Sequence, residues 1–114
     1  MSAQRDTVAG AVFAALADPT RRAVVRRLSQ VGSATASSLA AELPVTRQAI
    51  SKHLVALREA GLVVADPVGR EVRYRLTPAP FADAMGWMAS TGARWDERLA
   101  RLERRLAERA APPA

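Results

Sequence analysis

A short segment in the middle of the chain carries polar residues whose types and spacing suit the reading of DNA. Gln48 and Ser51 are candidates for base-edge contacts, because glutamine can bond adenine N6 and N7 together and serine can donate or accept. Lys52 and Arg47 suit phosphate contacts, and Arg47 also lies where a guanine is within reach. Thr46 is expected to cap a helix and to bond a phosphate. The alternative interpretation is an ordinary solvated helix face.

The pattern around these residues predicts an amphipathic helix that presents them to solvent. Ile50, Leu54 and Leu57 recur at i, i+4 and i+7, which places them on one buried face. On the opposite, polar face Val55 is the apolar exception, and Gly61 is expected to close the helix. A slender polar face of this kind suits a helix laid in the major groove.

The neighbouring elements predict a winged helix-turn-helix around this segment. A shorter helix is expected from its cap, Thr35, to Leu43, and Pro44 ends it because the residue before proline is pushed out of helical geometry. After the central helix, residues 62–76 read as a β-hairpin with its turn at residues 66–69. Helix, tight turn, helix and hairpin in this order are typical of DNA-binding proteins.

Arginines on the predicted hairpin add a second set of candidate DNA contacts. Arg70 lies at the tip beside Gly69, where a wing commonly touches phosphate or the adjacent minor groove. Arg73 is a further candidate, on the same face of the returning strand as Arg75. The alternative is a solvated hairpin whose arginines keep an edge strand from aggregating.

Two further helices are predicted before the helix-turn-helix. Asp6 is expected to cap the first of them, with Phe13 among its inward residues. Asp18 and Pro19 end that helix and begin the next, because aspartate is a good N-cap and proline suits the first helical position. The second helix is expected to run to about Ser29.

A second strong periodicity lies in residues 80–109. Eight positions spaced alternately by four and three residues form a heptad seam, and such a seam has little to cover in a small monomer. We therefore expect part of it to cover its own domain and part to cover a second subunit. Whether one helix or two carries the seam is left open, because Gly86 and Gly92 could break or bend it. The seam residues are Phe81, Met85, Met88, Gly92, Trp95, Leu99, Leu102 and Leu106.

Composition excludes several classes of function. The chain has 114 residues and no cysteine, so disulfides, thiolate metal sites and thiol redox sensing are ruled out. It has neither a G-x-S-x-G elbow nor a glycine-rich phosphate loop, so no catalytic residue is predicted and the chain is not expected to be an enzyme. His53 is the single histidine and is expected to be structural, because one histidine cannot build a tetrahedral metal site. No metal or other cofactor is predicted.

Charge is distributed unevenly along the chain. The net charge is +6, and residues 43–76 hold six Lys/Arg against three Asp/Glu. A basic patch there is the electrostatic footprint expected for a phosphate-binding surface. Large apolar side chains are few, since 25 of the residues are alanine. The chain is therefore expected to need a partner subunit to bury enough apolar surface.

Three segments in this order resemble the ArsR/SmtB family of small bacterial repressors. They are LADPTRR at residues 16–22, ISKHLVALREAGLV at residues 50–63 and GREVRYRL at residues 69–76, and the resemblance covers roughly residues 8–106. It implies a winged-helix homodimer whose first and last helices form the interface. It also implies an operator that is an imperfect inverted repeat, and repression that a signal releases.

The chain departs from the metal-sensing members of that family. Those members carry cysteines at the start of the recognition helix, where this chain has Pro44 and Thr46. Other members bind zinc between their last helices, whereas residues 80–109 contain no histidine. The chain therefore resembles the branch that does not sense metals, and an unidentified small-molecule or protein effector is left open as a partner.

Together these features predict a mainly α protein with a small β-hairpin, organised as one winged helix-turn-helix domain over residues 1–109. The DNA-binding part is expected at about residues 18–77, dimerisation helices at about 6–17 and 80–109, and a frayed tail at 110–114. The expected dimer-interface residues are Phe13, Met85, Met88, Trp95, Leu99, Leu102 and Leu106.

The predicted function is that of a dimeric, sequence-specific DNA-binding repressor in the cytoplasm, with double-stranded DNA as its partner and no membrane association. A winged-helix module for protein interaction, without sequence-specific DNA binding, is the alternative. The polarity of the outward helix face favours DNA, because Arg47, Gln48, Ser51 and Lys52 dominate it.

Overall fold

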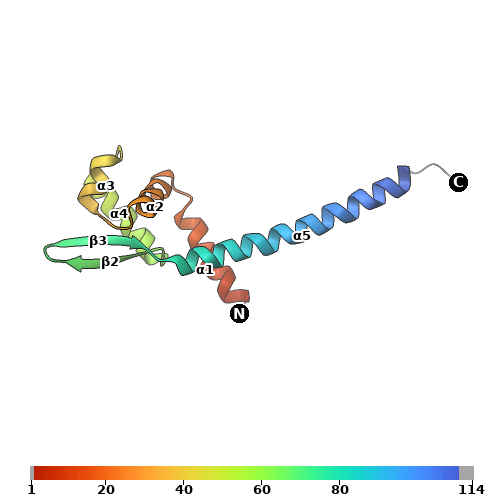
Figure 1. Cartoon of the computed structure of the whole chain (residues 1–114), viewed down its shortest axis with the longest axis horizontal. Helices are drawn as coiled ribbons and strands as arrows, with labels where there is room; N and C mark the ends of the chain where they lie inside the picture. The colour runs from red at the N-terminus through yellow and green to blue at the C-terminus, as the bar shows by residue number, and fades with distance from the viewer. Residues whose placement is uncertain (1, 111–114) are drawn as a thin grey trace.

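The computed structural model describes residues 2–110, with side chains described from residue 6. This part of the chain folds into five helices and a small antiparallel sheet, and a long C-terminal helix reaches away from the rest (Figure 1). The elements in chain order are α1 (Ser2–Ala15), α2 (Pro19–Val31), β1 (Ala34–Thr35), α3 (Ala36–Glu42), α4 (Arg47–Glu59), β2 (Val63–Val68), β3 (Glu71–Leu76) and α5 (Pro78–Ala110).

Local side-chain caps fix where three of the helices begin, as the sequence predicts. The Arg21 backbone N–H donates to Asp18 Oδ2 over 2.9 Å at the start of α2, with Pro19 in the first turn. Thr35 Oγ1 accepts from the Ser38 N–H before α3, and Thr46 Oγ1 accepts from the Ala49 N–H before α4, each over 3.1 Å. These bonds satisfy N–H groups that a helix leaves without partners.

The predicted bounds of the first two helices are wrong by a few residues. Helix α1 begins at Ser2, so Asp6 lies inside it and does not cap it, and the helix ends at Ala15. Helix α2 continues past Ser29 to Val31, because Gly32 (φ 85°) is the residue that leaves helical geometry. Both errors concern helix ends, where side-chain pattern constrains the backbone least.

Gly61 closes α4 as predicted. Its φ of 78° turns the chain out of the helix, and the Gly61 N–H donates to Arg58 O while the Leu62 N–H donates to Leu57 O, both over 2.9 Å. This pair of bonds is a Schellman arrangement, which satisfies the last carbonyls and sends the chain directly into β2.

The hairpin belongs to a three-stranded antiparallel sheet in the order β1-β3-β2. The sequence did not predict β1, and the predicted turn at residues 66–69 is wrong: β2 runs to Val68, and Gly69 (φ 63°) and Arg70 make the two-residue turn. Pro67 is tolerated because β2 is an edge strand. Pro67 lies opposite Val72, next to the Val68–Glu71 pair that closes the hairpin. In an antiparallel ladder the N–H at such a position points away from the partner strand, so no ladder hydrogen bond is lost when proline stands there.

One apolar core joins all these elements at the base of the hairpin. Its centre is formed by the predicted inward faces of α2, α3 and α4, including Ile50, Leu54 and Leu57, each at most 1% exposed. No polar or charged side chain is fully buried among the described residues. The core comprises Ala9, Val12, Ala15, Val24, Leu28, Ala34, Leu39, Ile50, Leu54, Leu57, Leu62, Val63 and Ala84.

The seam is carried by a single helix, which settles the question left open by the sequence. Helix α5 spans 33 residues, and only its first part packs on the domain, against α1 (Figure 1). There Phe13 and Trp87 meet edge to face, with ring centroids 5.6 Å apart. The predicted tail at 110–114 begins in the last residue of α5 and otherwise lies outside the described residues.

Candidate nucleic-acid interface

Helix α4 presents a polar face to solvent beside its buried one. The side chains of Arg47, Gln48, Ser51 and Lys52 are all exposed, and within residues 6–110 none of them has a side-chain partner. Val55 follows on the same face and is 52% exposed. Four uncommitted polar groups on a rigid helix are available to base edges and phosphates, because their rotamers are not held by the protein.

The turn between α3 and α4 leaves the N-terminus of α4 exposed to solvent. Leu43 caps the end of α3, and the Val45 N–H donates to Leu43 O over 2.8 Å around Pro44. Thr46 then starts α4 while remaining exposed. An exposed helix N-terminus offers N–H groups and the positive end of the helix dipole, both of which favour a phosphate.

His53 connects the recognition helix to the start of α2. Its Nδ1 lies 3.7 Å from Asp18 Oδ2, and its side chain is 20% exposed. The N–H donated by Arg21 is the main cause that lowers the pKa of the Asp18 carboxyl below its usual value. Burial opposes it as the second-largest cause, and the nearby His53 and Arg21 side chains add smaller effects that lower the pKa. His53 thus lies beside a carboxylate rather than a backbone group, and its structural role stays a prediction.

The wing places one arginine at its tip and binds two others to protein groups. Arg70 is exposed in the turn, and no bond to it is seen in the described part of the chain. Arg75 Nε donates to Asp66 Oδ2 across the hairpin over 2.8 Å. Arg70 is therefore the wing arginine most available to DNA.

Arg73 is committed to the loop before β1. Its Nε donates to Ser33 Oγ over 3.0 Å, its Nη2 donates to Ser33 O over 3.2 Å, and its Nη1 lies 3.4 Å from Glu71 Oε2. The side chain is 36% exposed, so part of the guanidinium still faces solvent. The structure thus gives Arg73 a bracing role between wing and helix-turn-helix, and its predicted DNA contact stays a prediction.

Ser33 is the residue at this site that sequence reasoning missed. It is positioned by β1, whose two residues pair with β3 through Ala34 opposite Tyr74 and Thr35 opposite Arg73. A two-residue strand has no readable alternation, so its pairing could be found only through β3, forty residues away.

Other kinds of site are not assembled in the part of the chain that the structure describes. Within it, no three His, Cys, Asp or Glu residues come together in a way that could hold a metal ion. No described helix is both long enough and apolar enough to span a membrane.

This arrangement of helices and hairpin is that of a winged helix-turn-helix DNA-binding protein. A family model described as a helix-turn-helix domain matches residues 16–64. The regulator CmtR of Mycobacterium tuberculosis is 43% identical over 82 residues, which are 72% of this chain and 69% of that protein. The regulator Rv2034 of the same organism is 47% identical over 68 residues, covering 60% of this chain and 63% of its own length.

The likeness extends to a solved structure. An ArsR-like transcriptional regulator from Rhodococcus sp. RHA1 superposes with a TM-score of 0.77 at 45% identity, covering 86% of this chain and 92% of that one. The chain belongs to the ArsR-type family of winged helix-turn-helix transcriptional regulators. It is accordingly a DNA-binding transcriptional regulator and not an enzyme.

Proposed function

We propose that the protein is a homodimeric repressor that binds an inverted-repeat operator through α4 and the wing. The observation that carries this proposal is the outward face of α4, where Arg47, Gln48, Ser51 and Lys52 are exposed with no partner among the described side chains. Two relatives of the chain are named as repressors, which supports repression as the mode of regulation. Its place of action is the cytoplasm, where the operator lies.

Contacts are divided among these residues by their chemistry. Gln48 and Ser51 read base edges, while Lys52, Arg47 and Thr46 hold phosphates around the start of α4. Arg70 reaches the backbone or minor groove from the wing tip, and Arg73 adds a phosphate contact with the part of its guanidinium that faces solvent.

The dimer forms through α1 and α5, because seven of the eleven large apolar side chains that the described chain leaves exposed lie on these two helices. Phe13 is 37% exposed on α1, and the predicted interface residues of α5 are each about half exposed or more. They are Met85, Met88, Trp95, Leu99, Leu102 and Leu106. A radius of gyration of 20.8 Å, against about 13 Å for a compact chain of this length, shows how little of α5 the monomer itself covers.

Binding to DNA from upstream of the protein's own gene tests the proposal. Fluorescence anisotropy with that duplex and a scrambled duplex, at several salt concentrations, should give a preference of about 10³ or more and a steep salt dependence. Equal weak affinity for both duplexes contradicts a specific operator at that site. Once the operator is known, small molecules and proteins that release it identify the effector.

A further inference from the structure

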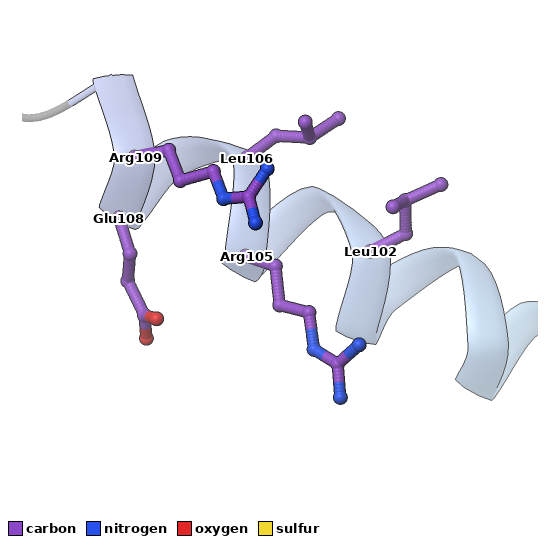
Figure 2. Close-up of a pocket in the computed structure, with 5 residues that line it drawn as sticks. All are labelled: Leu102, Arg105, Leu106, Glu108 and Arg109. Atoms are coloured by element: carbon purple, nitrogen blue, oxygen red, sulfur yellow. The ribbon is translucent and has the colours of Figure 1, made fainter.

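One exposed apolar residue, Val55, belongs neither to the core nor to the proposed dimer interface. Of the eleven large apolar side chains exposed in the described chain, seven lie on α1 and α5. Leu102 and Leu106 are examples, and they project to one side of α5 (Figure 2). Val55 lies instead on α4, where it is 52% exposed while the other large apolar residues of that helix are at most 1% exposed. A partner that covers Val55 must therefore come from what α4 binds.

Val55 continues the line of side chains that α4 presents to DNA. It lies seven positions after Gln48 and three after Lys52, and these spacings place all three residues on one face of the helix. In helices that lie in the major groove, residues three or four positions apart contact successive base pairs. Val55 is therefore expected about two base pairs beyond the pair that Gln48 contacts.

The chemistry of valine selects one group on the DNA. Its side chain forms no hydrogen bonds, and of the four bases only thymine presents an apolar group in the major groove, its C5 methyl. A base edge that carries only donors and acceptors would lose water against Val55 without gaining a partner, which costs free energy. In a helix the branched side chain is held almost entirely in one rotamer, so little side-chain entropy is lost when it makes the contact.

The surroundings of Val55 favour a base edge over the sugar-phosphate backbone as its partner. Val55, Arg58 and Glu59 line a shallow hollow of about 280 Å³ near the end of α4. Glu59 lies four positions after Val55 on the same face, and its side chain is exposed. The negative charge of Glu59 repels a phosphate, whereas a thymine edge carries no charge. Arg58 lies on a neighbouring line of the helix, seven positions after Ser51.

We infer that Val55 is a specificity-determining residue that contacts the C5 methyl of a thymine, about two base pairs from the pair that Gln48 contacts. This inference rests on the proposed function and adds an apolar contact to the polar ones. Because the proposed repressor is a dimer on an inverted repeat, such a thymine occurs once in each half-site. The contact contributes to the choice of operator without a hydrogen bond or a charge.

Replacement of thymine by deoxyuridine tests the contact, because it removes the methyl group and leaves every hydrogen-bonding group of the base pair in place. Each thymine of the operator is changed in turn, at the equivalent positions of both half-sites, and binding is measured by fluorescence anisotropy. At the position that Val55 contacts, the parent should lose about fourfold in affinity for each methyl group, and about fifteenfold in all, as the burial of one carbon per half-site predicts.

Val55→Ala tests whether this residue makes the contact. The variant removes two methyl groups from an exposed site, and alanine is the better helix former, so the fold should be kept. It should bind the natural operator more weakly than the parent does, and it should bind the thymine and deoxyuridine duplexes equally well. Val31→Ala is the matched control, because it removes the same groups from the end of α2, where Val31 is 42% exposed. It should respond to deoxyuridine as the parent does.

The outcomes separate this contact from the function on which it rests. Sensitivity at one position in the parent and in Val31→Ala, absent only in Val55→Ala, supports the inference. A parent that still prefers its operator over scrambled DNA but tolerates deoxyuridine everywhere overturns the inference and leaves the proposed repressor standing. Equal losses at every position in the parent and in Val55→Ala also overturn it, because another residue then contacts the methyl. If the parent prefers no duplex over scrambled DNA, both the function and the inference fail.

Discussion

Gln48 is the residue whose loss should change sequence preference most. Its side chain is exposed on α4 and has no partner in the described chain, so its donor and acceptor are both free for a base. We expect Gln48→Ala to reduce discrimination between operator and scrambled DNA by about 1–3 kcal/mol. Anisotropy titrations of both duplexes measure this, with Ser90→Ala on α5 as the control. An unchanged ratio of affinities would assign base reading to another residue.

Arg70 is expected to act on affinity without regard to sequence. Arg70→Ala should weaken binding to all duplexes alike and lower the slope of log K against log salt by about one, as the loss of one phosphate contact does. Arg101→Ala removes the same charge from the free part of α5 and should leave the slope unchanged. If both variants change the slope equally, the effect comes from net charge and not from a wing contact.

At the scale of elements, the cap of α2 makes stability depend on pH. The Arg21 N–H lowers the pKa of Asp18 in the folded chain, so folding favours the ionised carboxyl. The resulting stability is present above the unfolded pKa of about 3.8 and is lost as pH falls through the lower folded value. Urea unfolding between pH 5 and pH 2 should show this loss in the parent. Asp18→Asn keeps a capping oxygen and should lack that part of the pH dependence.

The bond between Arg73 and Ser33 joins the wing to the loop that precedes α3. We expect a double-mutant cycle of Arg73→Lys and Ser33→Ala to give a coupling of about 1 kcal/mol in unfolding free energy. Ser33→Ala should also weaken DNA binding, because the wing is held less firmly when the Arg73–Ser33 side-chain bond is lost. Since Ser33 carries no charge, this loss of affinity would not be a direct electrostatic effect. A zero coupling energy would show that the two residues act independently.

The elements that sequence could predict are those defined by neighbours in the chain. The caps at Asp18, Thr35 and Thr46 bond residues three positions away, and the buried face of α4 repeats within thirteen residues. Strand β1 and the Ser33–Arg73 bond depend on residues about forty positions apart, which no local pattern reveals. The predicted hairpin turn was placed too early because proline is common in turns. Pro67 instead lies within β2, since an edge strand can accommodate a residue without an N–H.

At the scale of the whole molecule, DNA affinity should depend on association of two chains. One helix-turn-helix unit contacts half of a twofold operator, and linking two units raises apparent affinity by about 10²–10⁴ through effective concentration. Helix α5, at about 50 Å, is long enough to space the two units, and in the proposed dimer its exposed apolar stripe, from Met85 to Leu106, would join them. We therefore expect the exposed apolar residues on α5 to promote operator binding without touching DNA.

Leu99→Glu places a charge in the middle of that stripe and tests this dependence. Leu99 is 51% exposed and far from the core, so the domain should still fold, while a buried carboxylate at the interface should separate the copies. We expect a monomer in sedimentation velocity and a loss of operator affinity of about 10²-fold or more.

Ala100→Glu provides the control, because it adds the same carboxylate one residue further along, on the outward side of α5. It should remain a dimer and bind the operator like the parent. If Leu99→Glu still sediments as a dimer, the interface lies elsewhere on the molecule. If it is a monomer that binds with parental affinity, a single helix-turn-helix unit suffices, and the exposed stripe of α5 serves some purpose other than operator binding.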